Sequence, residues 1–276
     1  YGKHVVPGFI ASYTRIGLTE ISAVKQTNDH SEIGEINPNV RANVSYNPDS
    51  DLIPVTRSNG ILIVNSVPAP GRISGQSSVM MLDGWTWEDA TLKHPTALNL
   101  NWPNMHLNLR KDAKKKEKDQ RDTYNKTLRE IDRLVRDVQA YPQRRTGRER
   151  KAEQKQQSDL RLESMIPFII HKEPIHVRAN DIRQIEAVVK WANKHDFNIV
   201  IVGARDAWRN PELLVKHNIP VILLSVQTTP WRRYEPIHTP YKVPAMLHEA
   251  GVRFCISTDP GYPFDGHVRT LPNEAM

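Results

Sequence analysis

Five short stretches of this sequence hold side chains that suit catalysis or ligand binding, and each stretch lies at the end of an apolar run. They are residues 11–15, 178–180, 203–205, 225–227 and 258–259. Asp259 carries a carboxylate that can act as a general base on water. Arg15 and Arg178 are permanently cationic and suit a substrate carboxylate or a developing oxyanion. We expect Tyr13 and Asn180, which stand beside the arginines, to help bind the substrate.

These residues also have structural interpretations. Asp259 opens an Asp-Pro-Gly sequence, which is typical of a tight turn. Arg15 and Arg178 can each form a structural ion pair, with Asp259 or Glu20 as the partner. The sequence leaves both interpretations open.

A metal site is not indicated. The chain has 11 histidines and one cysteine, and no His-x-His, His-Glu-x-x-His or Cys-x-x-Cys pattern. His176 lies two residues before Arg178, so it faces the same side of a strand at a deeper level. A metal site rebuilt from scattered histidines is the alternative. We expect no cofactor.

Alternating strands and helices must position these residues in the last part of the chain. Apolar runs predict strands over 174–179, 198–203, 219–224 and 252–257. Helical spacing and capping residues predict helices over 181–195, 206–218 and 243–250. Short connections favour a parallel α/β fold, either a barrel or a doubly wound sheet. Both folds gather their functional residues at the carboxyl ends of the strands.

The net charge of +7 comes from one segment. Residues 110–165 contain 18 Lys or Arg and 11 Asp or Glu, an excess of seven positive charges. Apolar residues at helical spacing predict a helix there, with a break at Tyr141–Pro142. Mixed charges favour a solvated helical insertion, which can also serve as a surface for a protein partner. Binding of nucleic acid through this segment is a weaker alternative, because few aromatic residues are interleaved for base stacking.

Four stretches together resemble the barrel of amidohydrolases, particularly the imidazolonepropionase-like branch. The first is Gly-Lys-His-Val-Val-Pro-Gly-Phe-Ile at 2–10, and the others lie at 59–64, 73–79 and 257–261. They occur in the order that this family shows, and the predicted strands and helices agree with it. The resemblance implies an α/β fold with a (β/α)8 TIM-type barrel, and it covers nearly the whole chain except 110–165.

The resemblance also implies a divalent metal, such as zinc, that is held at the strand ends. In this sequence the ligand positions of the first strand are occupied by Tyr13 and Arg15. Those of the fifth and sixth strands are occupied by Arg178 and Gly203. Only the aspartate of the last strand, Asp259, persists. A zinc site ordinarily needs about three protein ligands, so the resemblance implies a degenerate metal site.

Two functions from different classes remain. One is a hydrolase of C–N bonds in cyclic amides or small peptides, with an altered or absent metal. The other is a non-catalytic barrel that acts as a ligand-binding or scaffold protein. In both cases the expected partner is a small molecule, with an anion as the first candidate. Neither a membrane nor nucleic acid is expected as a partner.

The expected organisation has three parts. Residues 1–109 form the first half of the barrel, 110–165 the charged helical insertion, and 166–276 the truncated second half. The first residues resemble a strand that has already begun, and the last residues resemble the start of a helix. We therefore expect the sequence to be a fragment of a longer protein. The sequence does not determine the compartment, although we favour a secreted or periplasmic protein.

Overall fold

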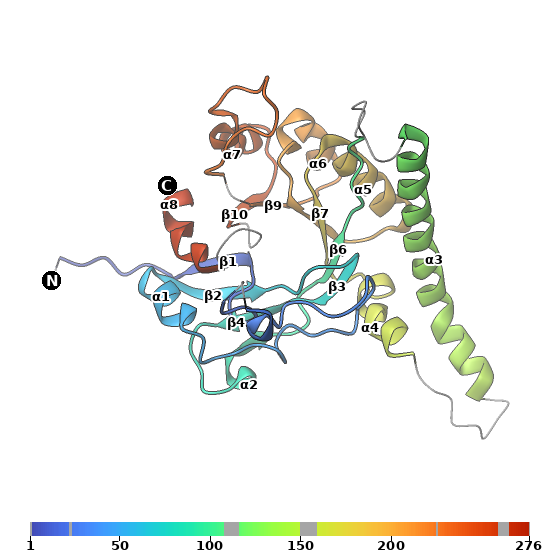
Figure 1. Cartoon of the computed structure of the whole chain (residues 1–276), viewed down its shortest axis with the longest axis horizontal. Coiled ribbons are helices and arrows are strands. Elements are labelled where there is room, and N and C mark those ends of the chain that lie inside the picture. Colours follow the sequence, from blue (N-terminus) through green and yellow to red (C-terminus); the bar gives the residue numbers. More distant parts are fainter. Residues whose placement is uncertain are drawn as a thin grey trace.

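A computed structural model describes residues 2–21, 24–107, 116–149, 159–224, 226–258 and 265–275 (Figure 1). The strands are β1 (Phe9–Thr14), β2 (Ile61–Ser66), β3 (Ile73–Gln76), β4 (Ser78–Met81), β5 (Thr91–Lys93), β6 (Leu98–Asn101), β7 (Ile175–Ala179), β8 (Ile199–Gly203), β9 (Val221–Leu224) and β10 (Phe254–Ser257). The α-helices are α1 (Leu52–Ser58), α2 (Trp87–Ala90), α3 (Glu117–Glu149), α4 (Leu160–Ile169), α5 (Ile182–His195), α6 (Pro211–Lys216), α7 (Thr239–Glu249) and α8 (Leu271–Ala275). Short 3-10 turns span Lys25–Thr27, Ala207–Arg209 and Asp265–Thr270.

The second half of the chain follows the predicted alternation of strands and helices. Strands β6 to β10 are all parallel and stand side by side in chain order. A doubly wound sheet reverses its strand order at a switch point. The order of β6 to β10 never reverses, so this part of the chain is not doubly wound.

Prolines set the helix boundaries that differ from the prediction. The helix expected over 206–218 is a 3-10 turn followed by α6, which begins at Pro211. Proline has no amide hydrogen and is favoured in the first turn of a new helix. For the same reason α7 begins at Thr239–Pro240, before the predicted start at Val243.

The first half of the chain departs from an arrangement of eight parallel strands. β1 and β2 are parallel, but β4 runs antiparallel to β2 and β3 runs antiparallel to β6. Only residues 67–72 connect β2 to β3. A parallel pair needs a crossover of about a dozen residues or more, so this short connection requires the chain to turn back.

The strands form two sheets that adjoin each other at both sides, and we call this arrangement the strand ring. One has the order β1-β2-β4-β5 and the other β10-β9-β8-β7-β6-β3. β3 and β4 are consecutive and separated only by Ser77, which joins the sheets on one side. On the other side, the Ser257 hydroxyl accepts a hydrogen bond from the Tyr13 amide at 3.1 Å and donates one to the Tyr13 carbonyl at 3.0 Å. A side chain therefore connects β10 to β1.

Side chains on the two faces of the parallel strands enter different cores. On β8 and β9, Ile201 and Leu223 pack outward in the large core against the helices. Val202 and Ile222 point inward and pack with Tyr13. This alternation gives the ring of strands an interior that is distinct from its helical layer.

Helix α3 is an integral part of the large core. Ile131, Val135 and Val138 are buried against the helical layer. Asp132 accepts hydrogen bonds from the Trp191 indole at 3.1 Å and from Lys194 at 2.8 Å, both on α5. The expectation of a solvated insertion is therefore wrong for this face of the helix, because its apolar spacing forms a packing stripe.

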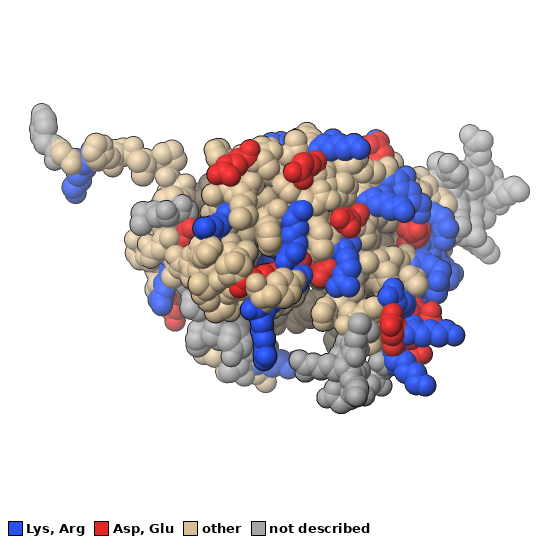
Figure 2. Space-filling model, turned by 90° about the horizontal axis from the view of Figure 1, so that it is seen from above, with Lys and Arg blue, Asp and Glu red and all other residues tan. Residues whose placement is uncertain are grey.

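The predicted break at Tyr141–Pro142 is also wrong, since α3 continues through Pro142 to Glu149. Figure 2 shows Lys and Arg lying beside Asp and Glu toward the α3 side of the molecule, with no uniform basic field on that face. Within the described residues, no helix combines the length and the apolar character that crossing a bilayer requires.

Candidate functional site

The candidate site lies at the carboxyl ends of the parallel strands β6 to β10, which stand side by side in one sheet (Figure 1). Parallel strands end at the same edge of a sheet, so residues far apart in sequence meet there. The residues that the sequence analysis proposed for the site are expected at this edge. The side chains at this edge differ in what they contact.

Tyr13 meets the inner face of β7. Its ring centroid lies 6.4 Å from that of His176, with the planes inclined by 43°. β1 and β7 are not neighbours in either sheet, so this contact crosses the interior of the strand ring. Arg178 lies two residues beyond His176 on the same face of β7, nearer the carboxyl edge. Tyr13 and His176 therefore meet in the interior, and Arg178 follows on the same face of β7, nearer the carboxyl edge.

The interior beneath Arg178 is polar and buried. Burial lowers the pKa of His176 to about 4, so this imidazole is neutral near pH 7. Its Nδ1 atom has no hydrogen-bond partner among the described residues, and neither has the Oδ1 atom of Asn99, its neighbour in register on β6. Buried polar atoms are usually satisfied by protein or water. These two atoms are therefore positions at which a water or a ligand can bind.

Arg15 lies beside His30, which is not one of the interior residues Tyr13, His176 and Arg178. It is close enough to His30 to contribute, after burial, to lowering the pKa of that histidine to about 4. The Nε atom of Arg15 is buried and has no hydrogen-bond partner in the described part of the chain. Arg15 therefore has a hydrogen-bond donor without a partner in the described residues, and it lies near His30.

Asn180 is placed by the turn from β7 into α5. Its amide donates to Gln184 Oε1 at 3.0 Å, and its carbonyl accepts from the Asp206 amide at 3.0 Å. Its side chain occupies the space beside Gly203, where an added Cβ would lie 2.3 Å from Asn180 Oδ1. Gly203 also has a φ of +91°, which disfavours any residue with a side chain. Asn180 therefore has a packing role that the sequence did not indicate.

Among the residues that the structure describes, the side chains at the strand ends do not form a donor set that fits a divalent cation. The strand ends carry Tyr13, Arg15 and Arg178, and a ligand side chain at Gly203 would collide with Asn180. Arginine cannot act as a metal ligand because it stays protonated. Among the described residues, no group of three or more His, Cys, Asp or Glu is arranged to hold a metal. Asp259, the expected catalytic residue, lies outside the described residues.

Sequence reasoning missed an ion cluster at the same edge, which we call the latch cluster. It consists of Asp181, Asp206, Glu235, Arg209 and Arg232. Arg232 reaches Asp206 at 2.6 Å, Glu235 at 2.7 Å and Asp181 at 3.4 Å. Arg209 pairs with Glu235 at 2.7 Å and with Asp206 at 3.4 Å.

The latch cluster fixes the loop after β9 onto the turns after β7 and β8. Side-chain exposure is only 3% for Asp206 and 7% for Asp181 and Glu235. Hydrogen bonds from Arg183 lower the pKa of Asp181, and those from Arg232 and Arg209 lower that of Glu235 against the opposing effect of burial. The available sequence signal was an aspartate soon after each of two neighbouring strands.

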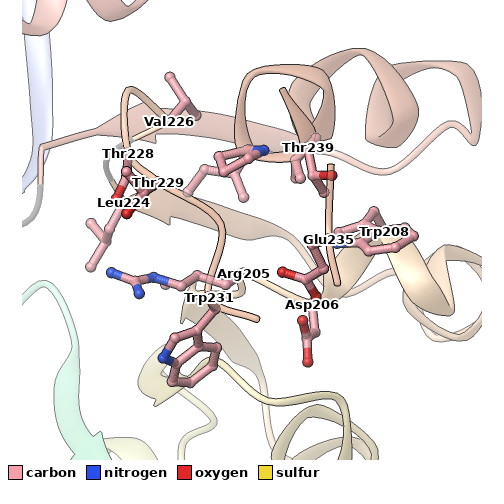
Figure 3. Close-up of a pocket in the computed structure, with 14 residues that line it drawn as sticks. Arg205, Asp206, Trp208, Leu224, Val226, Thr228, Thr229, Trp231, Glu235 and Thr239 are labelled. Carbon is pink, nitrogen blue, oxygen red and sulfur yellow. The ribbon is translucent and has the colours of Figure 1, made fainter. Parts of the chain in front are cut away.

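A pocket lies between the ends of β8 and β9 and the loop of residues 226–238, as Figure 3 shows. Its walls are largely apolar and include Trp208, Leu224 and Val243. Arg205, at the end of β8, extends between the Trp231 indole and the threonines of the loop (Figure 3). Its guanidinium carbon lies 5.3 Å from the Trp231 ring centroid. The sequence had marked Arg205 by position alone.

Comparison with known proteins identifies the fold. No protein-family model matches the sequence, and no curated protein matches it. The structure is similar to the crystal structure of an amidohydrolase from Thermotoga maritima MSB8, with a TM-score of 0.79 and 20% sequence identity. The match covers 98% of this chain and 69% of that chain. The two chains therefore share a fold.

Proposed function

We propose that this chain is an amidohydrolase-like hydrolase that binds a small anionic molecule at the carboxyl edge of its strand ring and cleaves a C–N bond in it. The observation that carries the proposal is the shared fold with an amidohydrolase over 98% of the chain. In that type of fold, reactions take place at the carboxyl ends of the strands. We further propose that the ring is a variant of the (β/α)8 barrel, closest in type to the imidazolonepropionase-like branch.

Arg178 is the proposed anion-binding residue. It stands on the inner face of β7, in register with Asn101 of β6 and Val202 of β8. A guanidinium offers several donors in a fixed fork that matches a carboxylate. Tyr13 and Asn180 are proposed as neighbouring substrate-binding residues, and Arg15 as a second cation near the edge. The charge at these positions supports an anionic substrate.

The proposed chemistry uses no metal. Asp259 would take a proton from a water that attacks the carbonyl carbon, and Arg178 would stabilise the oxyanion that forms. The oxyanion would then collapse to the carboxylic acid as the C–N bond breaks, and Asp259 would give its proton to the leaving nitrogen. A carboxylate near its reference pKa of about 4 is ionised at neutral pH but is a weak base. We therefore expect slow turnover with an unactivated amide and faster turnover with a strained cyclic one.

A second candidate is a barrel that binds the same class of molecule without turnover. The observation that favours it is the donor set at the strand ends, which does not fit the divalent cation that would normally activate water. In this case the exposed face of α3 would be the surface for a protein partner.

The test compares binding with turnover on one set of compounds. Dipeptides, hydantoins and imidazolones with a free carboxylate are incubated with the wild-type chain and with Asp259→Asn and Arg178→Met. The bound metal is measured in the same preparations. Turnover that Asp259→Asn abolishes while binding persists supports the hydrolase. Binding without turnover supports the second candidate.

Two controls complete the test. Arg233→Met removes an exposed arginine and should change neither binding nor turnover. A stoichiometric metal whose loss abolishes activity would contradict the metal-free chemistry. Absence of binding to every anionic compound would overturn both candidates.

A further inference from the structure

We propose that the pocket between β8, β9 and the loop of residues 226–238 binds a small aliphatic carboxylate, with Arg205 as the residue that binds the carboxylate group. This inference deepens the proposed function, on which it rests for the anionic substrate class. It assigns the carboxylate and the aliphatic group of that substrate to a pocket at Arg205, and it leaves to Arg178 the oxyanion that forms during the reaction.

Arg205 differs from the other arginines near the pocket in its partners. The carboxylates of Asp181, Asp206 and Glu235 are each paired with another arginine, namely Arg183, Arg209 or Arg232. A fourth carboxylate, that of Glu274, accepts a hydrogen bond from the amide of the pocket residue Val226 at 3.2 Å. No carboxylate pairs with Arg205 in the part of the chain that the structure describes.

Arg205 is restrained by stacking, and its hydrogen-bond donors remain available to a ligand. Its guanidinium stacks over Trp231 at 5.3 Å from the ring centroid, which limits its side-chain motion without using its hydrogen-bond donors. The residue is half-buried, so an ion pair formed there is screened less than one on the open surface. In Figure 3 the guanidinium lies between Trp231 and the side of the pocket formed by Leu224 and Thr229.

The walls of the pocket determine which apolar group of the ligand can accompany its carboxylate. Apolar side chains from the strands and helices surround the space, and they include Trp208, Leu223, Leu224, Val226 and Val243. The cavity volume is about 40 Å³. Since one water-sized sphere needs about 10–15 Å³ on this measure, the space takes roughly three such spheres. A short branched aliphatic group fits this space, whereas a fused aromatic ring system does not.

The first turn of α7 adds an electrostatic field that favours an anion in the pocket. Thr239 and Pro240 line the pocket, and they begin this helix. The first turn holds no acidic residue, and the N-cap residue His238 makes no side-chain capping hydrogen bond. The partial positive charge at a helix N-terminus therefore remains available to an anion. Together with Arg205, it favours a carboxylate over a neutral or cationic group.

Isovalerate is the probe that tests the proposal. Its binding is measured by calorimetry and ligand-observed NMR, beside 3-methylbutan-1-ol and isopentylamine, which have the same branched chain without the negative charge. We expect isovalerate to bind and both analogues to bind at least tenfold more weakly, because a charge-assisted hydrogen bond is lost. Equal binding of the alcohol and the acid would overturn the assignment of Arg205.

Variants locate the binding site. Arg205→Met should weaken isovalerate binding about tenfold or more, Arg205→Lys should weaken it less, and Arg233→Met should leave it unchanged. Thr228→Phe should block the apolar space and weaken isovalerate and the alcohol alike. The urea midpoint of each variant checks that it is folded. Unchanged isovalerate binding in a folded Arg205→Met variant would overturn the inference.

Arg178→Met separates this inference from the proposed function. If Arg178→Met abolishes isovalerate binding and Arg205→Met does not, the anion site is at Arg178. That result rejects the pocket and leaves the proposed function intact. If isovalerate binds through Arg205 but no compound is hydrolysed, the pocket stands and the hydrolase proposal fails.

Discussion

The guanidinium of Arg232 lies 2.6 Å from a carboxylate oxygen of Asp206, and this contact joins the loop after β9 to the turn after β8. The same arginine also reaches Asp181 in the turn after β7. A single side chain therefore holds three neighbouring strand-end loops together over the edge where the proposed site lies.

Removal of Arg232 should destabilise the fold strongly. In Arg232→Met, the nearly buried carboxylate of Asp206 loses its closest cation, and breaking such a pair costs about 3–5 kcal/mol. Urea unfolding at pH 7 measures the change. Arg233→Met, at an exposed neighbouring position, is the control and should stay within about 0.5 kcal/mol of wild type. A loss below about 1 kcal/mol in Arg232→Met would mean that the latch cluster contributes little.

Ser257→Ala should loosen the junction between β1 and β10. The Ser257 hydroxyl is fully buried and makes two hydrogen bonds with the backbone of Tyr13. Loss of a buried hydrogen-bond partner costs about 1–3 kcal/mol. Hydrogen exchange should show faster exchange of the Tyr13 amide, and urea unfolding should show the lower stability. Ser58→Ala, an exposed change, serves as the control. Unchanged exchange at Tyr13 would show that other contacts close the ring.

His176 should make the stability depend on pH between about 6.5 and 4. Burial lowers its folded-state pKa to about 4, whereas the unfolded chain binds the proton below about 6.5. The contribution of neutral His176 is therefore complete above pH 6.5 and is lost as the pH falls toward 4. At pH 4.5 the loss relative to pH 7 should be roughly 2–3 kcal/mol.

The measurement compares unfolding at pH 7 and pH 4.5 in wild type and in His176→Gln. His30 and His94, whose pKa values are also lowered to about 4 by burial and a nearby arginine, contribute in the same direction in both proteins. The difference between the two proteins therefore isolates His176. His248→Gln, at an exposed position on α7, is the control. Equal pH dependence in wild type and His176→Gln would contradict the prediction.

Ile131→Ala should show that α3 is needed for the fold. Ile131 is 4% exposed and packs in the large core, so the cavity left by alanine should cost about 2–5 kcal/mol. Arg133→Ala, on the exposed face of the same helix, should change stability by less than about 0.5 kcal/mol. Thermal and urea unfolding provide the measurement. A small effect of Ile131→Ala would support a detachable insertion instead.

Local patterns predicted much of the parallel half. The apolar run at 199–203 and the capped, amphipathic helix at 182–195 are specified by neighbouring residues, and both appear as predicted. Asp181 caps that helix through a hydrogen bond to the Arg183 amide, which is also a local interaction. The antiparallel segment of β3 and β4 was missed, because its direction depends on the length of the connection and on its partners in two sheets.

The location of the candidate site is still a prediction, and the contacts among its residues could not be predicted from the sequence. Tyr13 and Arg178 were identified from their positions at strand ends, but the contact between Tyr13 and His176 crosses the ring and no spacing indicates it. Asn180 is expected to bind substrate, and the sequence did not indicate that its side chain also fills the space beside Gly203. The place of Asp259 is still a prediction.

The sequence by itself determined the alternation of strands and helices and the types of side chain at the strand ends, because hydrophobic periodicity and capping act between residues close in the chain. Only the tertiary structure decided which of those side chains meet. Arg232 pairs with Asp206 across 26 residues, and Ser257 closes the ring onto Tyr13 across 244 residues. Such pairings depend on how whole strands pack in space, so the residues near each partner in the sequence do not predict them.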